Sequence, residues 1–192
     1  MDFLKSSKSA LNRTLKEIND GGVVVFPTDT VYGFLADATN KKAVEKIYRI
    51  KKRPKAKPLP IFVKNINMAK SLAEIDKAQE KIIKKHWPGK FTFVLKRIDG
   101  MKLYGIDKNT IALRIPEYKP LNNLLKKINK PLAQTSVNIS GRPSAAKVKE
   151  ITEQFKNNKY QPDLIIDAGN LPKRKSSIII NLSEDKSKIL RP

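Results

Sequence analysis

Apolar runs that end in polar loops alternate along this chain with segments of helical periodicity. Leu11, Leu15 and Ile18 recur at helical spacing, and the glycines of the following "NDGG" favour a left-handed helix cap. The continuous run from Val23 to Phe26 is typical of a strand covered on both faces, and Pro27 ends it. Further strands are predicted at 59–63, 91–95, 110–115 and 131–136, and in "LIID" and "SIIINL". Further helices are predicted around 43–48, 66–86, 121–128 and 148–155.

This mixture of strands and helices contains no repeat and no low-complexity linker. It predicts an α/β fold in which helices pack on one open, twisted β-sheet. Loops of hairpin length between some of the strands favour a mixed sheet. We expect residues 1–192 to form a single domain, because 192 residues are enough for one good core and too few for two.

Lysine and arginine outnumber the acidic residues, 40 to 18, which gives a formal net charge of +22. Such a surplus favours anionic partners, namely nucleotides, nucleic acid or membrane headgroups, but it does not bear on the fold. Lysines scattered over solvated faces would account for part of it. Because charges are screened over about 8 Å at physiological salt, only cations placed close to a site contribute to binding there.

Several kinds of chemistry are excluded by the composition. The chain has no cysteine and one histidine, His86, so thiolate zinc sites, a thiol nucleophile, a histidine metal cluster and a Ser-His-Asp triad are not expected. Neither a P-loop nor a "GxGxxG" turn occurs, so a nucleotide would have to be held in another way. The chain has no signal-peptide core and no apolar run of about 18 residues, and we expect a soluble, cytoplasmic protein.

The first two candidate loops follow a strand and a helix. In "PTDTVYG", two threonines and Asp29 come directly after the apolar run, although a turn stabilised by Asp and Thr side chains explains this pattern equally well. In "IKKRPKAKPL", Arg53 precedes Pro54, which favours extended backbone there and would turn Lys51 and Arg53 to the same side. Together they would suit adjacent phosphate oxygens, and the alternative is a basic loop in solvent.

The remaining candidates come from the second half of the chain. Ser136 and Asn138 repeat the same two-residue spacing in "TSVNISGRP", where Gly141 would allow a close backbone approach, or the segment is only a polar turn. Arg114, inside the apolar strand "ALRIP", needs a partner. We group with it Ser177 in "RKSSIII" and Arg191 in the final "LRP".

Taken in order, these segments resemble the YrdC-like family of L-threonylcarbamoyladenylate synthases, in its short form. The family reads "PTDTxYGL", "KxRP" followed by "PL", "WPGPxT", "TxAxRxP", "TSANxSG", "STI" and a late Arg; this chain reads "PTDTVYGF", "KKRPKAKPL", "WPGKFT", "TIALRIP", "TSVNISG", "SSIIINL" and "LRP". The resemblance covers nearly the whole chain. Lys90, Val137 and Ile178 are departures from it. It implies a YrdC-like fold with a concave basic cavity, without the extra C-terminal domain of the long form.

The resemblance implies that threonine, bicarbonate and ATP give threonylcarbamoyl-AMP and pyrophosphate, the first step of tRNA threonylcarbamoyladenosine modification. The Mg²⁺ would be held mainly by phosphates rather than by protein side chains. Partner proteins would take the adenylate to tRNA. The implied ATP and phosphate ligands are Lys51, Arg53, Ser136, Asn138 and Arg191. The implied threonine and bicarbonate ligands are Thr30, Lys57, Arg114 and Ser177, and the implied supports of the loops are Asp29, Tyr32 and Thr135. Asp29 could instead assist a magnesium ion.

Two other functions fit parts of the sequence. A non-enzymatic binder of double-stranded RNA or tRNA needs only the charge of +22 and a basic sheet face, but it gives no reason for Ser136, Asn138 or Arg114. An enzyme could also contact RNA, so the two are not exclusive. A carbamoyl-transfer module of a hydrogenase-maturation protein ranks last, because nothing in the chain supplies the other domains of such a protein.

Overall fold

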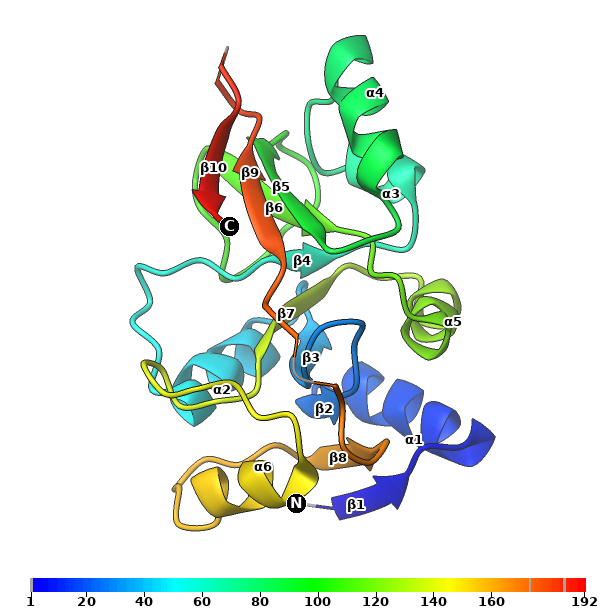
Figure 1. The fold of residues 1–192 in the computed structure, drawn as a ribbon, viewed down its shortest axis with the longest axis vertical. Coiled ribbons are helices and arrows are strands. Elements are labelled where there is room, and N and C mark those ends of the chain that lie inside the picture. Colours follow the sequence, from blue (N-terminus) through cyan, green and yellow to red (C-terminus); the bar gives the residue numbers. More distant parts are fainter. Residues whose placement is uncertain (1, 173, 185) are drawn as a thin grey trace.

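The computed structural model describes residues 2–172, 174–184 and 186–192, which form ten strands and six helices (Figure 1). The strands are β1 (Asp2–Lys5), β2 (Val24–Phe26), β3 (Gly33–Asp37), β4 (Ile61–Phe62), β5 (Phe91–Lys96), β6 (Thr110–Arg114), β7 (Leu132–Ser136), β8 (Leu164–Asp167), β9 (Ile178–Asn181) and β10 (Lys188–Arg191). The helices are α1 (Lys8–Asn19), α2 (Lys41–Lys51), α3 (Ile66–Lys70), α4 (Lys77–His86), α5 (Lys119–Ile128) and α6 (Val148–Phe155).

All ten strands belong to one open sheet in the order β1-β8-β2-β3-β7-β4-β6-β5-β9-β10. The sheet contains both parallel pairs, such as β1 with β8 and β5 with β9, and antiparallel pairs, such as β3 with β7 and β5 with β6. The predicted α/β fold with an open mixed sheet is therefore confirmed. In Figure 1 the sheet runs from β1 at the bottom to β10 at the top, so the first and last strands of the chain form its two edges.

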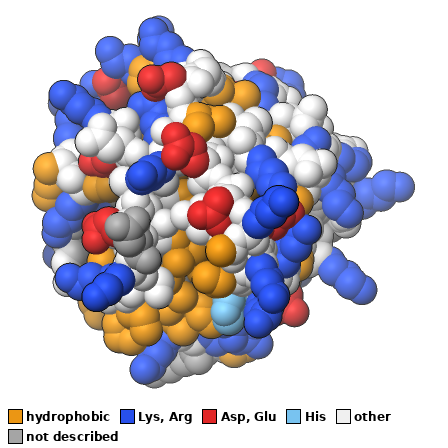
Figure 2. All heavy atoms as spheres, turned by 90° about the horizontal axis from the view of Figure 1, so that it is seen from above, with side chains coloured by type: hydrophobic (Ala, Val, Ile, Leu, Met, Phe, Trp, Pro, Cys, Tyr) orange, Lys and Arg blue, Asp and Glu red, His pale blue; other side chains and the backbone are white. Residues whose placement is uncertain are grey.

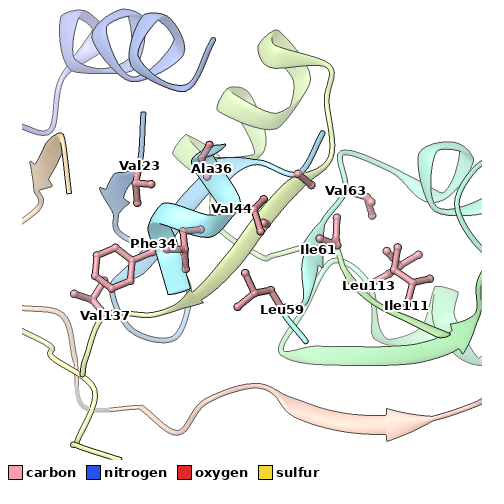
Figure 3. Close-up of a cluster of buried hydrophobic side chains, with 14 of the residues drawn as sticks. Val23, Phe34, Ala36, Val44, Leu59, Ile61, Val63, Ile111, Leu113 and Val137 are labelled. Carbon is pink, nitrogen blue, oxygen red and sulfur yellow. The ribbon is translucent and has the colours of Figure 1, made fainter. Parts of the chain in front are cut away.

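The sheet is covered on both faces, and each face has its own apolar cluster. Val23 and Val25 belong to the larger cluster, shown in Figure 3, while Val24 and Phe26 belong to the other, which confirms the two-sided prediction for this run. Helices α2, α3, α4 and α6 contribute to the larger cluster. Helices α1 and α5 pack against the opposite face, over β2, β3, β4, β7 and β8.

The sequence pattern missed three strands, β1, β3 and β10. β1 and β10 are edge strands in which every residue is exposed, so their sequences need not alternate between apolar and polar residues. β3 is buried along its whole length and begins at a glycine, which gives neither an alternating pattern nor a β-branched run. The strand predicted at 59–63 is shorter than expected, since β4 is limited to Ile61–Phe62 and follows Pro60, which has no N–H for a ladder.

Figure 2 shows the molecule from the end that carries β9, β10 and α4. Lysine and arginine side chains are spread over this face among acidic and apolar ones rather than gathered into one cluster, so much of the charge surplus here is ordinary solvated surface. Among the described residues, no helix is both long enough and apolar enough to span a membrane.

Candidate functional site

A cavity of about 290 Å³ lies on the face of the sheet that α1 and α5 cover only in part. Val94, Ala112 and Ile179, from β5, β6 and β9, line it, whereas the alternate residues Phe93 and Leu113 belong to the larger apolar cluster on the opposite face. Of the residues assigned a role from the sequence, the following line this cavity: Thr30, Tyr32, Arg53, Arg114, Thr135, Ser136, Ser177 and Arg191. Lys51, Lys57, Asn138 and Asp29 do not line it.

Three arginines from separate elements converge on the cavity: Arg53 from the loop after α2, Arg114 from β6 and Arg191 from β10. Burial lowers the pKa of Arg191, and the nearby Arg53 lowers it further. Burial also lowers the pKa of Arg114, where Asp29 acts in the opposite direction and Arg191 adds repulsion. Guanidinium groups nevertheless stay protonated at neutral pH. An anion with several oxygens would relieve this mutual repulsion, so the cavity favours such a ligand.

Arg114 is held by a buried ion pair. Its side chain is 2% exposed; Nη2 donates to Asp29 Oδ2 at 2.6 Å and Nε donates to the Gly89 carbonyl at 2.9 Å. Gly89 is required there because a Cβ would lie 2.3 Å from the carbonyl oxygen of His86. The strand arginine therefore has the partner that the sequence led us to expect. Asp29 positions it, and the two bonds use two of the five guanidinium N–H groups.

Ser177 and Arg191 contact each other directly. Arg191 donates from Nε and Nη2 to the Ser177 carbonyl, at 3.0 and 2.6 Å, and from Nη2 to Ser177 Oγ at 3.1 Å. Ser177 Oγ also lies 2.9 Å from Thr92 Oγ1, a fully buried hydroxyl. Sequence reasoning gave Thr92 no role, although it is the final residue of "WPGKFT", and its place in that motif was the available signal.

The β2–β3 loop is ordered by its own hydroxyls. Thr28 Oγ1 donates to the Val31 carbonyl at 2.7 Å, so the Thr30 hydroxyl, 3.0 Å away, must donate to Thr28 Oγ1. Thr30 therefore presents an oxygen acceptor to the cavity that it lines. Tyr32 fixes the other end of the loop: its hydroxyl donates to Gly169 O at 2.8 Å and accepts from Ala168 N at 3.0 Å. Burial raises the pKa of Tyr32, which keeps its hydroxyl a donor.

The extended geometry predicted for Lys51 and Arg53 is wrong. Helix α2 continues through Lys51, and Lys52 ends it in the left-handed region at φ 51°. The two side chains consequently bond to different segments. Lys51 Nζ reaches Ser136 and Asn138, whereas Arg53 donates from Nε to the Lys57 carbonyl and from Nη2 to the Pro58 carbonyl, each at 3.0 Å. The Lys57 side chain is exposed, and only its backbone takes part in these contacts.

The loop after β7 is linked to the cavity by Ser136. Its hydroxyl donates to Asn138 Oδ1 at 2.7 Å, and Asn138 Nδ2 donates to the carbonyls of Ile139 and Arg142 at 2.9 and 2.7 Å. Gly141 lies in the left-handed region at φ +87°, and no atom lies within 4 Å of the position that a Cβ would take. The glycine is therefore required for its backbone conformation, and the close backbone approach that it would allow stays a prediction.

A second cavity, of about 840 Å³, adjoins the first, because Val31 and Ser176 line both. Arg142, Arg174 and Lys175 supply its positive charges. Sequence reasoning assigned none of these three residues a role, although the "KRK" before "SSIII" was a visible signal. Arg174 Nη1 donates to the Asp29 carbonyl at 3.0 Å, which ties the second cavity to the loop that lines the first.

The described residues do not form a metal site. They contain no group of three or more His, Cys, Asp or Glu side chains placed to hold a metal ion. Asp29 Oδ1 is buried without a hydrogen-bond partner among them, but Oδ2 is engaged by Arg114 and by the Glu117 N–H. A magnesium ion here would need most of its oxygen ligands from phosphate and water, as is usual for this ion beside nucleotides.

The fold is that of an α/β protein with two adjoining cavities that carry arginine side chains. The chain belongs to the Sua5/YciO/YrdC family, whose model, described as "Telomere recombination", matches residues 16–192. This confirms the resemblance recognised in the motifs. A protein of Methanocaldococcus jannaschii is 38% identical over 179 residues, covering 93% of this chain and 83% of that one. The threonylcarbamoyl-AMP synthase of Psychromonas ingrahamii is 30% identical over 170 residues, covering 86% and 88%.

The same relationship holds for solved structures. The Sua5 protein of Pyrococcus abyssi, in a crystal structure described as complexed with L-threonine, superimposes with a TM-score of 0.88 at 31% identity. The match covers 100% of this chain and 56% of the Pyrococcus abyssi protein. This chain thus spans little more than half the length of that relative.

Proposed function

We propose that this protein is a threonylcarbamoyl-AMP synthase, which uses L-threonine, bicarbonate and ATP to make threonylcarbamoyl-AMP and pyrophosphate. The observation that carries the proposal is the convergence of Arg53, Arg114 and Arg191 on one cavity whose remaining wall is partly apolar. A triphosphate and an amino-acid carboxylate are anions that such a cation cluster would bind, while Val94 and Ala112 offer a surface to a small side chain. Relatives that carry this name, matched over most of this chain, support the assignment.

The chemistry needs positioning more than it needs a protein nucleophile. The threonine amine and bicarbonate combine, with loss of water, into an N-carboxylate. One oxygen of this carboxylate attacks the α-phosphorus of ATP, the bond from that phosphorus to the bridging oxygen of the β-phosphate breaks, and pyrophosphate leaves. Fixed cations stabilise the charge that develops on the phosphate oxygens, and holding the reactants together removes most of the entropic barrier. A site without cysteine and with no catalytic histidine is sufficient for this reaction.

The geometry supports a division of roles. Arg53 and Arg191, which line the same cavity, would bind the phosphates. Arg114, fixed by Asp29, would bind the threonine carboxylate, with Thr30 and Ser177 beside it. The first cavity, at about 290 Å³, is too small for ATP and threonine together, so the nucleoside would extend into the adjoining cavity. Magnesium would be carried by the phosphates. The contribution of Lys57 stays a prediction.

Pyrophosphate release tests the proposal directly. With ATP present, the wild-type protein should release pyrophosphate only when both threonine and bicarbonate are added. Arg53→Ala should lower the rate by about 10- to 100-fold, because it removes charged hydrogen-bond donors to phosphate. Lys55→Ala is the matched control: Lys55 is an exposed cation of the same loop that lines neither cavity, and its loss should leave the rate unchanged. Release that ignores threonine, or an Arg53→Ala rate equal to wild type, would contradict the assignment.

Delivery of the product to tRNA by partner proteins belongs to the same proposal, and so does direct contact with RNA. Salt separates the RNA-binding alternative from the enzyme. Affinity for double-stranded RNA should fall steeply with the logarithm of the salt concentration, whereas ATP bound in the cavity should be much less sensitive. A protein that binds RNA in this way and releases no pyrophosphate under any substrate combination would be the non-enzymatic binder.

A further inference from the structure

Lys51 is a buried cation whose partners are all neutral oxygens. Its side chain, 1% exposed, lies at the end of α2, and Nζ donates to Ser136 O at 2.5 Å, Asn138 O at 2.9 Å and Asn138 Oδ1 at 3.0 Å. An ammonium group has three N–H donors and no acceptor, so these three bonds satisfy it completely. All three acceptors belong to residues 136–138, at the start of the segment 136–142, which we call the β7 loop.

The backbone of α2 holds the same loop. Ser140 N donates to the Lys51 carbonyl at 2.8 Å, so both the backbone and the side chain of Lys51 form hydrogen bonds with the β7 loop. Within the loop, the Asn138 side chain is also fully engaged: Oδ1 accepts from Lys51 Nζ and Ser136 Oγ, and Nδ2 donates to two loop carbonyls. Of these groups, only Ser136 lines the first cavity.

Among the described residues, no acidic side chain is paired with the Lys51 ammonium. The Phe34 ring lies 5.8 Å from Nζ, and the ion pairs among the described residues do not include Lys51. Burial, with a smaller contribution from the nearby Arg53, lowers the pKa of Lys51 to about 7. The nearby charged group is therefore Arg53, while Phe34 from β3 and Ser136 and Asn138 from the β7 loop are uncharged. Arg142, the one cation of the β7 loop, lines the second cavity. Near neutral pH the side chain is divided between ammonium and amine.

We propose that Lys51 is a positioning residue rather than a phosphate ligand: its ammonium orders the β7 loop through three oxygens and acts on the phosphates in the first cavity only through Ser136. The inference rests on the proposed function for the nature of the ligand. Turning the ammonium toward phosphate would take the Lys51 donor away from the Ser136 and Asn138 carbonyls and leave Asn138 Oδ1 with Ser136 Oγ alone, and losing a donor to a buried oxygen is costly. A neutral amine has two N–H groups and a lone pair, so it cannot satisfy all three oxygens, and deprotonation should loosen the loop.

A double-mutant cycle on ATP affinity distinguishes positioning from direct contact. Calorimetry without threonine would compare wild type, Lys51→Met, Ser136→Ala and the double variant. If Lys51 acts only through Ser136, adding Ser136→Ala to Lys51→Met should change the dissociation constant by less than about twofold, although each substitution alone weakens binding. Arg53→Ala is the positive control, because Arg53 lines the cavity itself and should weaken ATP binding by a similar factor in both backgrounds. Multiplying effects of Lys51→Met and Ser136→Ala would overturn the proposal.

A second measurement uses the free protein and needs no ATP. In ¹⁵N spectra of wild type between pH 6 and 9, the amides of residues 137–142 should shift together with a midpoint near 7. The same shifts should be absent in Lys51→Met, and signals that titrate in both proteins report other groups. Loop amides that neither titrate nor differ in chemical shift between wild type and Lys51→Met would refute the positioning role whatever ATP does. A wild-type protein that binds no ATP but shows this loop titration would instead refute the proposed function and keep the role of Lys51 in the loop.

Discussion

The buried ion pair between Asp29 and Arg114 gives the sharpest prediction about stability. Arg114→Met leaves the Asp29 carboxylate, 3% exposed, with the Glu117 N–H in place of a full countercharge, and leaves the Gly89 carbonyl without its donor. Breaking a buried pair from one side costs about 3–5 kcal/mol, since the remaining charge stays out of water. For a protein of 192 residues this corresponds to a fall in Tm of about 6–20 °C.

Urea unfolding would measure the effect through Trp87, the one tryptophan of the chain, which is buried and donates from Nε1 to the Phe91 carbonyl at 2.7 Å. Combining Arg114→Met with Asp29→Asn removes both charges. The fall in the free energy of unfolding of the double variant should therefore be smaller, by at least about 1.5 kcal/mol, than the sum of the falls in the two single variants. Lys16→Ala is the control, because its pair with Asp20 is exposed and should change stability by no more than about 0.5 kcal/mol. Strictly additive losses at Asp29 and Arg114 would refute the reasoning.

Three further predictions follow from specificity, backbone geometry and pH. Serine should be a poor but detectable substrate, and valine should not be turned over. The reason is that a site discriminates roughly 10- to 200-fold against a substrate that lacks a methyl group, but up to about 10⁵-fold against one that lacks a hydroxyl that the site binds. Equal ATP consumption with valine and threonine would contradict this prediction. Gly105→Ala should lower the free energy of unfolding in urea by at least about 1 kcal/mol, because Gly105 has φ +71° and a Cβ would lie 2.8 Å from Val44 Cγ1. Gly141→Ala should show only the cost of placing alanine in the left-handed region, since no atom lies within 4 Å of its Cβ position. Between pH 7 and 9 the unfolded chain keeps the Lys51 proton that the native state has lost. The free energy of unfolding should therefore rise with pH by up to about 1.4 kcal/mol per pH unit. Lys51→Met should not show this rise.

Much of the interior of the fold could be predicted from the sequence, because buried positions recur with the period of the helix or strand that contains them; β3, which is buried at every residue, is the exception. The strand after "NDGG" and the strongly amphipathic helix α5 are found where periodicity places them, and Gly21 does adopt the left-handed conformation at φ 85° that the cap requires. The edge strands could not be found this way. β1 and β10 are defined by backbone pairing to neighbours far along the chain, and their exposed side chains carry no pattern of burial.

The site was predictable as a set of residues but not as a set of contacts. Local spacing correctly indicated that Arg114 needs a partner, but the identity of that partner depends on β6 meeting the β2–β3 loop in space. The same limit explains the error at Lys51. The effect of proline on Arg53 says nothing about where the preceding helix ends, and Lys52 tolerates a left-handed conformation that spacing rules do not anticipate.

The placement of the two terminal strands at opposite edges of the sheet has a practical consequence. Arg191 and Leu190 line the first cavity, so an affinity tag or fluorophore fused after Pro192 would begin beside its rim and would compete with substrate for access. A fusion ahead of β1 would be attached at the far edge of the sheet (Figure 1). Immobilised or labelled forms of this protein should therefore be tethered through the amino end.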